Sequence, residues 1–297
     1  MSYCIVAFVL VLMAVFIYMV GRSRYLYAFF KNDDQKIQIY TGWRPNAISL
    51  YKELQIVGRD PSILRVGEYY YIAVTEFDPQ TGKDFVIYKT KDFNQIERHE
   101  IKAGLTTPQT QSVWAPDLFQ TKDGKVGVVI SVQAEGNPLE TDKNGNEMKV
   151  FDNYTMILNL ENMTVSTVKK LLLDGGNKID GHIFWDTDSY RLLIKDEKNK
   201  EIELWSSNDF VTWSQDYDTI PQTKTDIEGA FVIKSGGLYT IYTDEYPEGN
   251  KKAGGIYFTQ TRDFKHFSNR QKLTTKDHIR HGSGLYLPSI FEFWVDR

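Results

Sequence analysis

Residues 231–245, FVIKSGGLYTIYTDE, hold the pattern that decides the fold: two runs of β-branched and aromatic residues joined by a turn with two glycines. This pattern is typical of a β-hairpin. Three other stretches share it, namely SILRVGEYYYIAVT (62–75), DLFQTKDGKVGVVISV (117–132) and HIFWDTDSYRLLIKD (182–196). A third strand-like run follows each of the four, at 84–90, 153–160, 202–210 and 255–264. The sequence therefore predicts an all-β domain built from one repeated unit.

Three of these units end in a related turn: TKDF at 90–93, SNDF at 207–210 and TRDF at 261–264. We expect the Ser or Thr and the Asp of this turn to bond the backbone, because short polar side chains stabilise turns in this way. The aromatic ring should then pack back on its own unit.

Short motifs stand at the starts of the units, around positions 60, 117, 180, 228 and 281. A unit of three or four strands that repeats at intervals of about 40–50 residues is typical of propeller blades. Five units fit the length of the chain. We therefore predict a single five-bladed β-propeller over residues 35–297, and two packed sheets are the alternative.

The ends of the domain should close the ring together. Few residues follow position 281, and they can supply about two strands, whereas a blade needs about four. Two strand-like runs near the start, KIQIYTG from Lys36 and ISLYKELQI from Ile48, have no blade of their own. Since an open sheet edge invites aggregation, we predict backbone pairing between residues 36–56 and residues 284–296.

The first 21 residues differ from the rest of the chain. They contain no charged side chain, and CIVAFVLVLMAVFIYMV (4–20) is almost wholly apolar. A spanning helix needs about 20 apolar residues, so we predict a transmembrane anchor within 1–21, with a cleaved signal segment as the alternative. Residues 22–34 are predicted to be a linker. Arg22, Arg24 and Lys31 follow the apolar stretch, and the positive-inside rule would place the domain in the cytoplasm.

Charge and cysteine content exclude several classes of function. The net charge of −4 and the pI of about 5.8 give no electrostatic footprint for nucleic acid. Cys4 is the single cysteine, so the chain can form no internal disulfide and no cysteine-based metal cluster. Any metal must be held by oxygen and histidine.

Five motifs open the repeats: RDPS (59–62), VWAPD (113–117), IDGHIFWD (179–186), EGAF (228–231) and RHGS (280–283). In a propeller the first strand of each blade lines the central channel, so residues far apart in sequence meet around one axis. Asp60, Asp180 and Glu228 should therefore converge at one end of the channel. Alone, each of them is more typical of an ordinary turn or strand start, and only their common place in the repeat indicates a site.

This set of motifs resembles glycoside hydrolase family 43, which contains arabinanases, arabinofuranosidases and xylosidases. The resemblance covers nearly the whole predicted domain, with all five motifs in order. It implies that Asp60 is the general base that activates water, that Glu228 is the general acid, and that Asp180 favours the protonated form of Glu228 and holds it in place. Hydrolysis with inversion needs such a carboxyl pair about 6.5–9.5 Å apart. Gly181 and Ala230 depart from the family pattern, where proline is common, but neither change removes a chemical group.

Further residues of the motifs are candidates for binding substrate. Trp114 could stack on a sugar face or belong to the core. Asp117, His182, Phe184 and Arg280 are the other candidates. For Asp117 the alternative is a backbone bond between blades, and Arg280 could pair either with a site carboxylate or with a sugar hydroxyl.

His281 is the only candidate for metal binding. The resemblance to arabinanase-like members implies that it helps to hold a structural calcium ion in the channel through water. One imidazole without a carboxylate cage is a poor calcium site, so a neutral histidine that bonds within the channel is the alternative. The hydrolysis itself requires no cofactor.

The leading interpretation is thus an inverting glycosidase that acts on arabinose- or xylose-containing oligo- or polysaccharides. The alternatives are a fructan-acting propeller hydrolase and a membrane-anchored, non-catalytic glycan-binding propeller. We expect a monomer, held at the membrane through residues 4–20 or secreted, with the domain outside the cell because polymeric glycans lie there. The polar stretch 134–149 should form a hairpin extension that reaches over the site.

Overall fold

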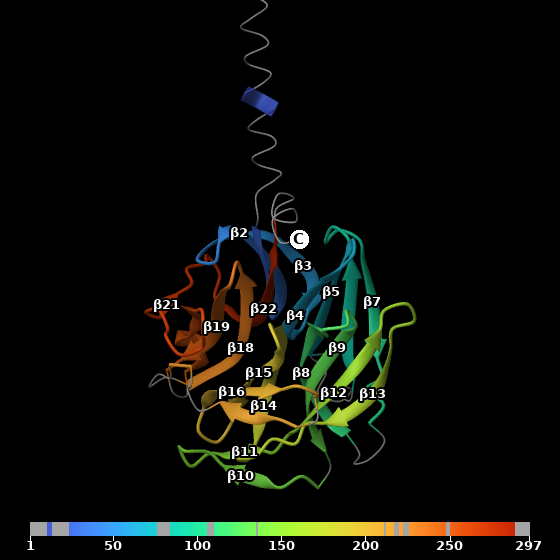
Figure 1. Ribbon diagram of the computed structural model, residues 1–297, viewed down its shortest axis with the longest axis vertical. Helices are drawn as coiled ribbons and strands as arrows, with labels where there is room; N and C mark the ends of the chain where they lie inside the picture. The colour runs from blue at the N-terminus through green and yellow to red at the C-terminus, as the bar shows by residue number, and fades with distance from the viewer. Residues whose placement is uncertain are drawn as a thin grey trace, which may run out of the picture.

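The computed structural model describes residues 11–13, 24–75, 84–105, 110–134, 136–210, 212–216, 220–221, 226–247 and 250–288. Five antiparallel sheets of four strands each are arranged around a central axis, and one small hairpin extends from the second of them (Figure 1). The predicted five-bladed β-propeller is confirmed.

The blades share one plan, in which the strand that lines the axis comes first and the others follow outward. Blade 1 contains β4 (Arg59–Val66), β5 (Tyr69–Thr75), β6 (Phe85–Thr90) and β7 (Ile96–Ile101). Blade 2 contains β8 (Thr110–Gln120), β9 (Val126–Ala134), β12 (Asp152–Asn159) and β13 (Thr164–Lys170). Blade 3 contains β14 (Lys178–Asp186), β15 (Ser189–Asp196), β16 (Glu201–Ser207) and β17 (Ser214–Asp216). Blade 4 contains β18 (Asp226–Ser235), β19 (Leu238–Tyr246), β20 (Gly255–Thr261) and β21 (Gln271–Lys272), with the 3-10 helix η1 (Lys251–Ala253) between β19 and β20.

The fifth blade joins the two ends of the domain, but through a different strand from the one predicted. Its order is β22 (Ile279–Leu287), β1 (Arg24–Lys31), β2 (Lys36–Arg44) and β3 (Ala47–Val57). The prediction that residues 36–56 pair with residues 284–296 is therefore wrong for residues 284–287, because β1 lies between them, and residues 289–296 lie outside the described residues. The predicted linker 22–34 is wrong for residues 24–31, which form β1. β1 is buried on both faces, as an apolar strand next to the axis must be.

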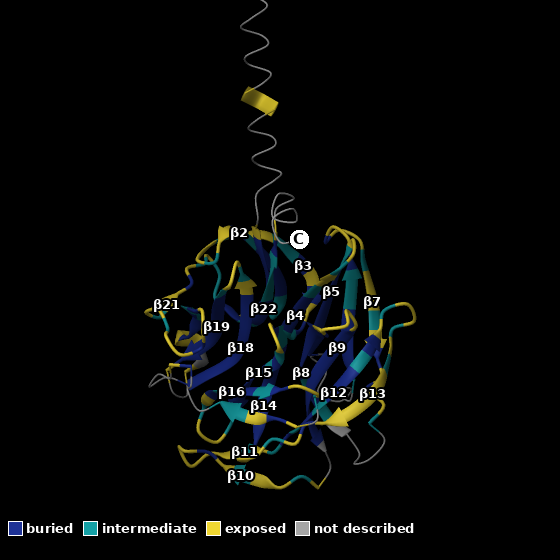
Figure 2. Ribbon diagram, viewed as in Figure 1, coloured by how far each residue is buried: buried dark blue, intermediate teal, exposed yellow. Residues whose placement is uncertain are grey.

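The core consists of five apolar clusters, one between each pair of neighbouring blades. A blade has two faces, and both must be covered, so strands near the axis are apolar along nearly their whole length. Figure 2 shows this gradient, with dark blue inner strands such as β18 and an exposed outer strand β13.

The three related turns have the predicted chemistry. The hydroxyl oxygens of Thr90, Ser207 and Thr261 accept hydrogen bonds from the backbone N–H groups of Phe93, Phe210 and Phe264, at 2.9, 3.0 and 2.9 Å. Phe93 and Phe264 are buried against their blades and Phe210 packs on the core between blades 2 and 3, so each turn closes the outer hairpin of its blade.

Most of the apolar segment 1–21 lies outside the described residues. Residues 11–13 are helical. No helix in the described part of the chain is long and apolar enough to cross a membrane.

Candidate active site

Each inner strand carries a β-bulge near its start, where its register with the second strand shifts. The shifts fall at 59–62 in β4, 114–117 in β8, 179–182 in β14, 228–231 in β18 and 280–282 in β22. The first bulged residue of four blades has a positive φ, namely Asp60 (52°), Ala115 (45°), Asp180 (57°) and Gly229 (58°). A bulge re-aims side chains that strict alternation would send to the faces of the blade. The same backbone device thus turns Asp60 and Asp180 toward the axis.

The bulges meet at one end of the channel. Asp60, Asp180 and Glu228 all line a single cavity of about 730 Å³ there, together with His281 and Trp114. The structure therefore brings together the three carboxylates that the sequence pointed to.

Asp60 is held as an anion by its neighbours. The Thr75 hydroxyl donates a hydrogen bond to its Oδ2 at 2.9 Å, and His281 Nδ1 lies 3.3 Å from its Oδ1. Burial by itself raises the pKa of Asp60, but the charge and hydrogen bond of His281, the charge of Arg59 and the Thr75 bond outweigh it and lower the pKa to about 2. Thr75 Oγ1 also accepts the backbone N–H of Ala115 at 2.8 Å, which fixes blade 2 against blade 1.

The pKa of Asp180 is shifted in the opposite direction, above its usual value. Burial raises its pKa from 3.8 to about 6; the charges of Glu228 and Asp60 act in the same direction, against His281 and Lys195. Its backbone N–H donates to the Ser131 hydroxyl at 3.2 Å, which fixes the bulge. Two carboxyls of one cavity thus have widely separated pKa values, so that between about pH 2 and about pH 6 Asp60 is ionised while Asp180 is protonated.

Both carboxylate oxygens of Glu228 accept hydrogen bonds. Arg280 donates to its Oε1, while Lys195 Nζ at 3.2 Å and the Tyr246 hydroxyl at 2.9 Å donate to its Oε2. Arg280 is itself held by Asp244, the residue paired with Glu228 across β18 and β19. Of the two roles considered for Arg280, pairing with a site carboxylate is the one observed.

His281 sits between two of the carboxylates, 3.3 Å from Asp60 and 3.8 Å from Asp180. Burial lowers its pKa, but the charges of Asp180 and Asp60 outweigh this and raise the pKa to about 9. Its ring packs on Gly229, where a Cβ atom would lie 2.5 Å from the imidazole carbons. The glycine of EGAF is therefore needed both for its positive φ and for the space that the imidazole fills.

The surroundings of His281 do not fit direct coordination of a metal. Among the described residues, no group of three or more histidine, cysteine, aspartate or glutamate side chains is placed to hold an ion. The Nδ1 atom that faces the carboxylates is a hydrogen-bond donor when the ring is protonated. A calcium ion held through water remains a prediction from the resemblance, and no step below uses it.

Trp114 forms one wall of the cavity. The Arg59 guanidinium lies 5.6 Å from its ring centroid, and the ring of Phe151 lies 4.6 Å away on centroids. Another part of the lining comes from the small hairpin of β10 (Leu139–Thr141) and β11 (Glu147–Lys149), whose turn residues Asp142, Asn144 and Asn146 line the cavity. The predicted reach of the stretch 134–149 over the site is thus confirmed.

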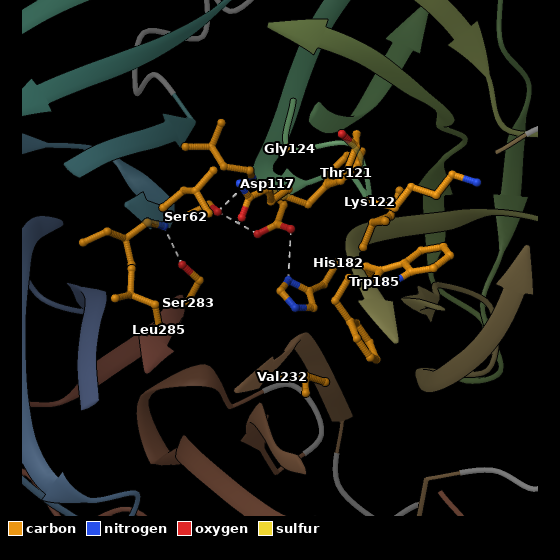
Figure 3. A pocket seen from close by; sticks show the side chains of 18 residues that line it. Ser62, Asp117, Thr121, Lys122, Gly124, His182, Trp185, Val232, Ser283 and Leu285 are labelled. Carbon is orange, nitrogen blue, oxygen red and sulfur yellow. Dashed lines mark hydrogen bonds and ion pairs between the residues drawn. The ribbon is translucent and has the colours of Figure 1, made fainter. Parts of the chain in front are cut away.

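Three predicted substrate-binding residues lie elsewhere. Asp117, His182 and Phe184 line a second cavity of about 470 Å³, farther along the channel (Figure 3). There Asp117 accepts hydrogen bonds from Ser62 at 2.7 Å and faces His182 Nδ1 at 3.0 Å. The prediction that they contact substrate beside the carboxylates is not supported, because each lies just past its bulge. The bonds of Asp117 do join blades, but they are made with the side chains of Ser62 and His182 and not with backbone, as the alternative role had it.

Sequence reasoning missed Lys195 and Tyr246, which line the cavity, and Asp244, which lies buried behind it and holds Arg280. All three belong to second strands, β15 and β19, and Lys195 pairs in register with Ile179 beside Asp180. A signal was available, since a lysine within the apolar run RLLIKD must find a buried partner.

Comparison with known proteins identifies the family. The family model for glycosyl hydrolases family 43 matches residues 54–259, more than half of the chain and four of the five motifs. The chain belongs to glycosyl hydrolase family 43. It is therefore a glycoside hydrolase, which favours the leading interpretation over a fructan-acting enzyme and over a non-catalytic glycan-binding protein.

Solved structures of family 43 proteins share the fold at low sequence identity. The GH43 protein BlXynB from Bacillus licheniformis superposes with a TM-score of 0.55 at 18% identity, over 80% of this chain and 42% of that one. An arabinanase from Bacillus subtilis gives 0.54 at 14%, over 76% and 81%. An exo-β-1,3-galactanase from Clostridium thermocellum gives 0.55 at 14%, over 73% and 48%. The chain thus spans less than half of the BlXynB and galactanase chains. No curated protein matches its sequence.

Proposed function

We propose that this family 43 enzyme hydrolyses arabinose- or xylose-containing glycans with inversion at the anomeric carbon. The observation that carries the proposal is one cavity in which Asp60, Asp180 and Glu228 meet, with Asp60 held ionised at neutral pH. An inverting glycosidase needs one carboxylate to activate water and one carboxyl group to protonate the leaving oxygen.

The roles follow from the surroundings of each group. Asp60, with its pKa near 2 and its geometry fixed by Thr75, takes a proton from the attacking water. Glu228 gives a proton to the leaving oxygen. Asp180 repels the charge of Glu228, and because the repulsion is mutual it opposes ionisation of the acid. Lys195, Tyr246 and Arg280 orient the Glu228 carboxyl group.

The cavity lining is suited to a neutral sugar. Its cations Arg59, Lys195 and Lys200 stand among more numerous carboxylates, so an anionic substrate would be repelled. Trp114 offers an aromatic face, and sugar rings stack on such faces through their C–H groups. A galactose-containing glycan is the second candidate, supported by the structural similarity to a galactanase.

The experiment is a screen of the full chain in detergent against aryl pentosides, arabinan, arabinoxylan and β-1,3-galactan. A protein beginning at residue 35 would lack β1 and is unsuitable. Proton NMR of the first-formed product should show the anomer opposite to that of the substrate. The same anomer would contradict inversion, and hydrolysis of galactan alone would reject the pentose assignment.

The acid is tested by Glu228→Gln. General acid catalysis contributes about 10²–10⁴-fold, so the variant should lose far more activity on substrates with poor leaving groups than on dinitrophenyl glycosides. Tyr246→Phe, which removes only one hydrogen bond to Glu228, is the matched control. An equal loss on both kinds of substrate would reject Glu228 as the acid.

A further inference from the structure

A groove with exposed aromatic residues lies at the end of blade 5 remote from the carboxylates. It has a volume of about 480 Å³ and runs between the β2–β3 hairpin and the turn after β6, with Ile48, Tyr51 and Phe93 among its lining residues. Trp43 and Tyr51 are 42% and 58% exposed, and the neighbouring Leu50 is 43% exposed. Large apolar side chains gathered in this way on a surface mark an interaction site.

Arg24, Lys91 and Asp92 line the groove, and Arg44 is exposed beside Trp43. Arg24 and Arg44 are exposed, and neither makes an ion pair with another residue of the described ranges. Lys91 on the other side is bonded to Glu68 at 2.9 Å. Tryptophan and tyrosine next to arginine are the residues that favour the interface between lipid headgroups and acyl chains.

The chain itself indicates what lies against this groove. Arg24, which lines the groove, is the first residue of β1, and the apolar stretch 4–20 ends only a few residues before it. The described residues of that stretch, Val11, Leu12 and Met13, are 60%, 51% and 55% exposed, so the propeller does not cover them. The apolar stretch 4–20 thus precedes β1 at the end of the domain where this groove lies.

The catalytic cavity lies at the other end. The register of β22 with β1 pairs Arg280 with Phe30 at one end and Leu287 with Arg24 at the other. The six steps along the strand from His281 to Leu287 cover about 20 Å at the usual rise of about 3.3 Å per residue. Figure 1 agrees, with β10 and β11 at the bottom and the end of β2 at the top.

We propose that this groove docks on the headgroup region of a lipid bilayer that the stretch 4–20 enters, so that the catalytic mouth faces away from the membrane. Docking fixes the angle between the propeller and the bilayer, which a bare tether would leave free. The arrangement holds on either side of the membrane, because it depends on the groove and not on the direction of insertion. It leaves the cavity open to polymers in the aqueous phase.

The test uses the full chain in phosphatidylcholine vesicles whose acyl chains carry bromine near the headgroup, which quenches tryptophan emission at that depth. All proteins carry Trp294→Phe, because Trp294 lies outside the described residues. Bromine should quench the emission of the parent, and Trp43→Phe should lose that quenching. Tyr51→Trp, in the same groove, should add quenched emission if the Trp43 variant fails to fold.

The matched reporter is Leu172→Trp, because Leu172 is 70% exposed and follows β13 at the catalytic end. Its added emission should be insensitive to bromine. Equal quenching at positions 43 and 172, or none at 43, would overturn the proposal. So would a shift of Trp43 emission that depends on protein concentration without vesicles, which would assign the groove to a second copy of the chain.

Discussion

Replacing Lys195 with methionine should destabilise the protein more than any other single neutralisation of a lysine in the cavity. Lys195 Nζ lies 3.2 Å from Glu228 and 2.7 Å from Glu197, and 2% of its side chain is exposed. Breaking a buried ion pair by removing one partner costs about 3–5 kcal/mol. Glu228 keeps Arg280, and Glu197 keeps Lys200 at 2.8 Å. We therefore expect the lower end, a loss of about 3 kcal/mol in the free energy of unfolding.

The deficit should depend on pH in a defined direction. Burial raises the pKa of Asp180 to about 6, and the charge of Lys195 is among the influences that lower it. Without that charge, the folded-state pKa of Asp180 rises further. A carboxyl whose folded-state pKa is raised contributes stability below its unfolded value of 3.8, and that contribution is lost as the pH rises through the folded value. The deficit should therefore be larger above about pH 8 than below about pH 5.

Urea unfolding at several pH values measures both effects. The matched control is Lys234→Met, because Lys234 pairs with Asp186 at 3.2 Å but its side chain is 42% exposed. An exposed pair contributes about 0–1 kcal/mol. If Lys195→Met lost no more than the control at every pH, the buried network would not stabilise the cavity and the reasoning would be refuted.

Four further substitutions test other parts of the site. The stability of the wild type should fall as the pH rises from 3.8, the unfolded-state pKa of Asp180, to about 6, its folded-state pKa. Asp180→Asn should flatten this fall in urea unfolding, and an unchanged slope would contradict the assignment. Asn144→Ala should raise KM several-fold for oligosaccharides but not for a small aryl glycoside, since the hairpin lies at the rim, and equal effects on both would contradict this. Ala115→Gly should raise the free energy of unfolding by about 0.5–1 kcal/mol, because it relieves a positive φ. Gly229→Ala should lower it by more than about 1 kcal/mol, and calorimetry measures the sign of both changes.

The fold was predictable because its signal is local and repeated. Each hairpin and each T-x-D-F-type turn reports its own structure, and the turn bonds at Phe93 and Phe264 are those that the residue types require. β1 was missed for a physical reason. Its sequence RYLYAFFK is buried on both faces and therefore lacks the alternation of a half-exposed strand, and the charged residues around it, Arg22, Arg24 and Lys31, made it resemble a linker.

The site was predictable only in its first strands. Recognisable motifs contain Asp60, Asp180 and Glu228. The second strands contain Lys195 and Asp244, and the pairing of those strands cannot be read from the sequence. The prediction that Asp117 lies with the carboxylates was wrong because Asp117 follows Ala115, the bulged residue of β8, by two positions. Such a shift along a bulged strand moves a side chain from one layer of the channel to the next.

The bulges show which part of the site belongs to the fold and which to the chemistry. Ala115 has the same positive φ as Asp60 and Asp180, although its side chain has no chemical role. The strained turn at the start of an inner strand is therefore a feature of the propeller, present in blades with and without a carboxylate. Aspartate tolerates this conformation better than most residues. The roles that we propose then need only that aspartate occupy this position in blades 1 and 3, and that Glu228 precede it in blade 4, where glycine makes room for His281.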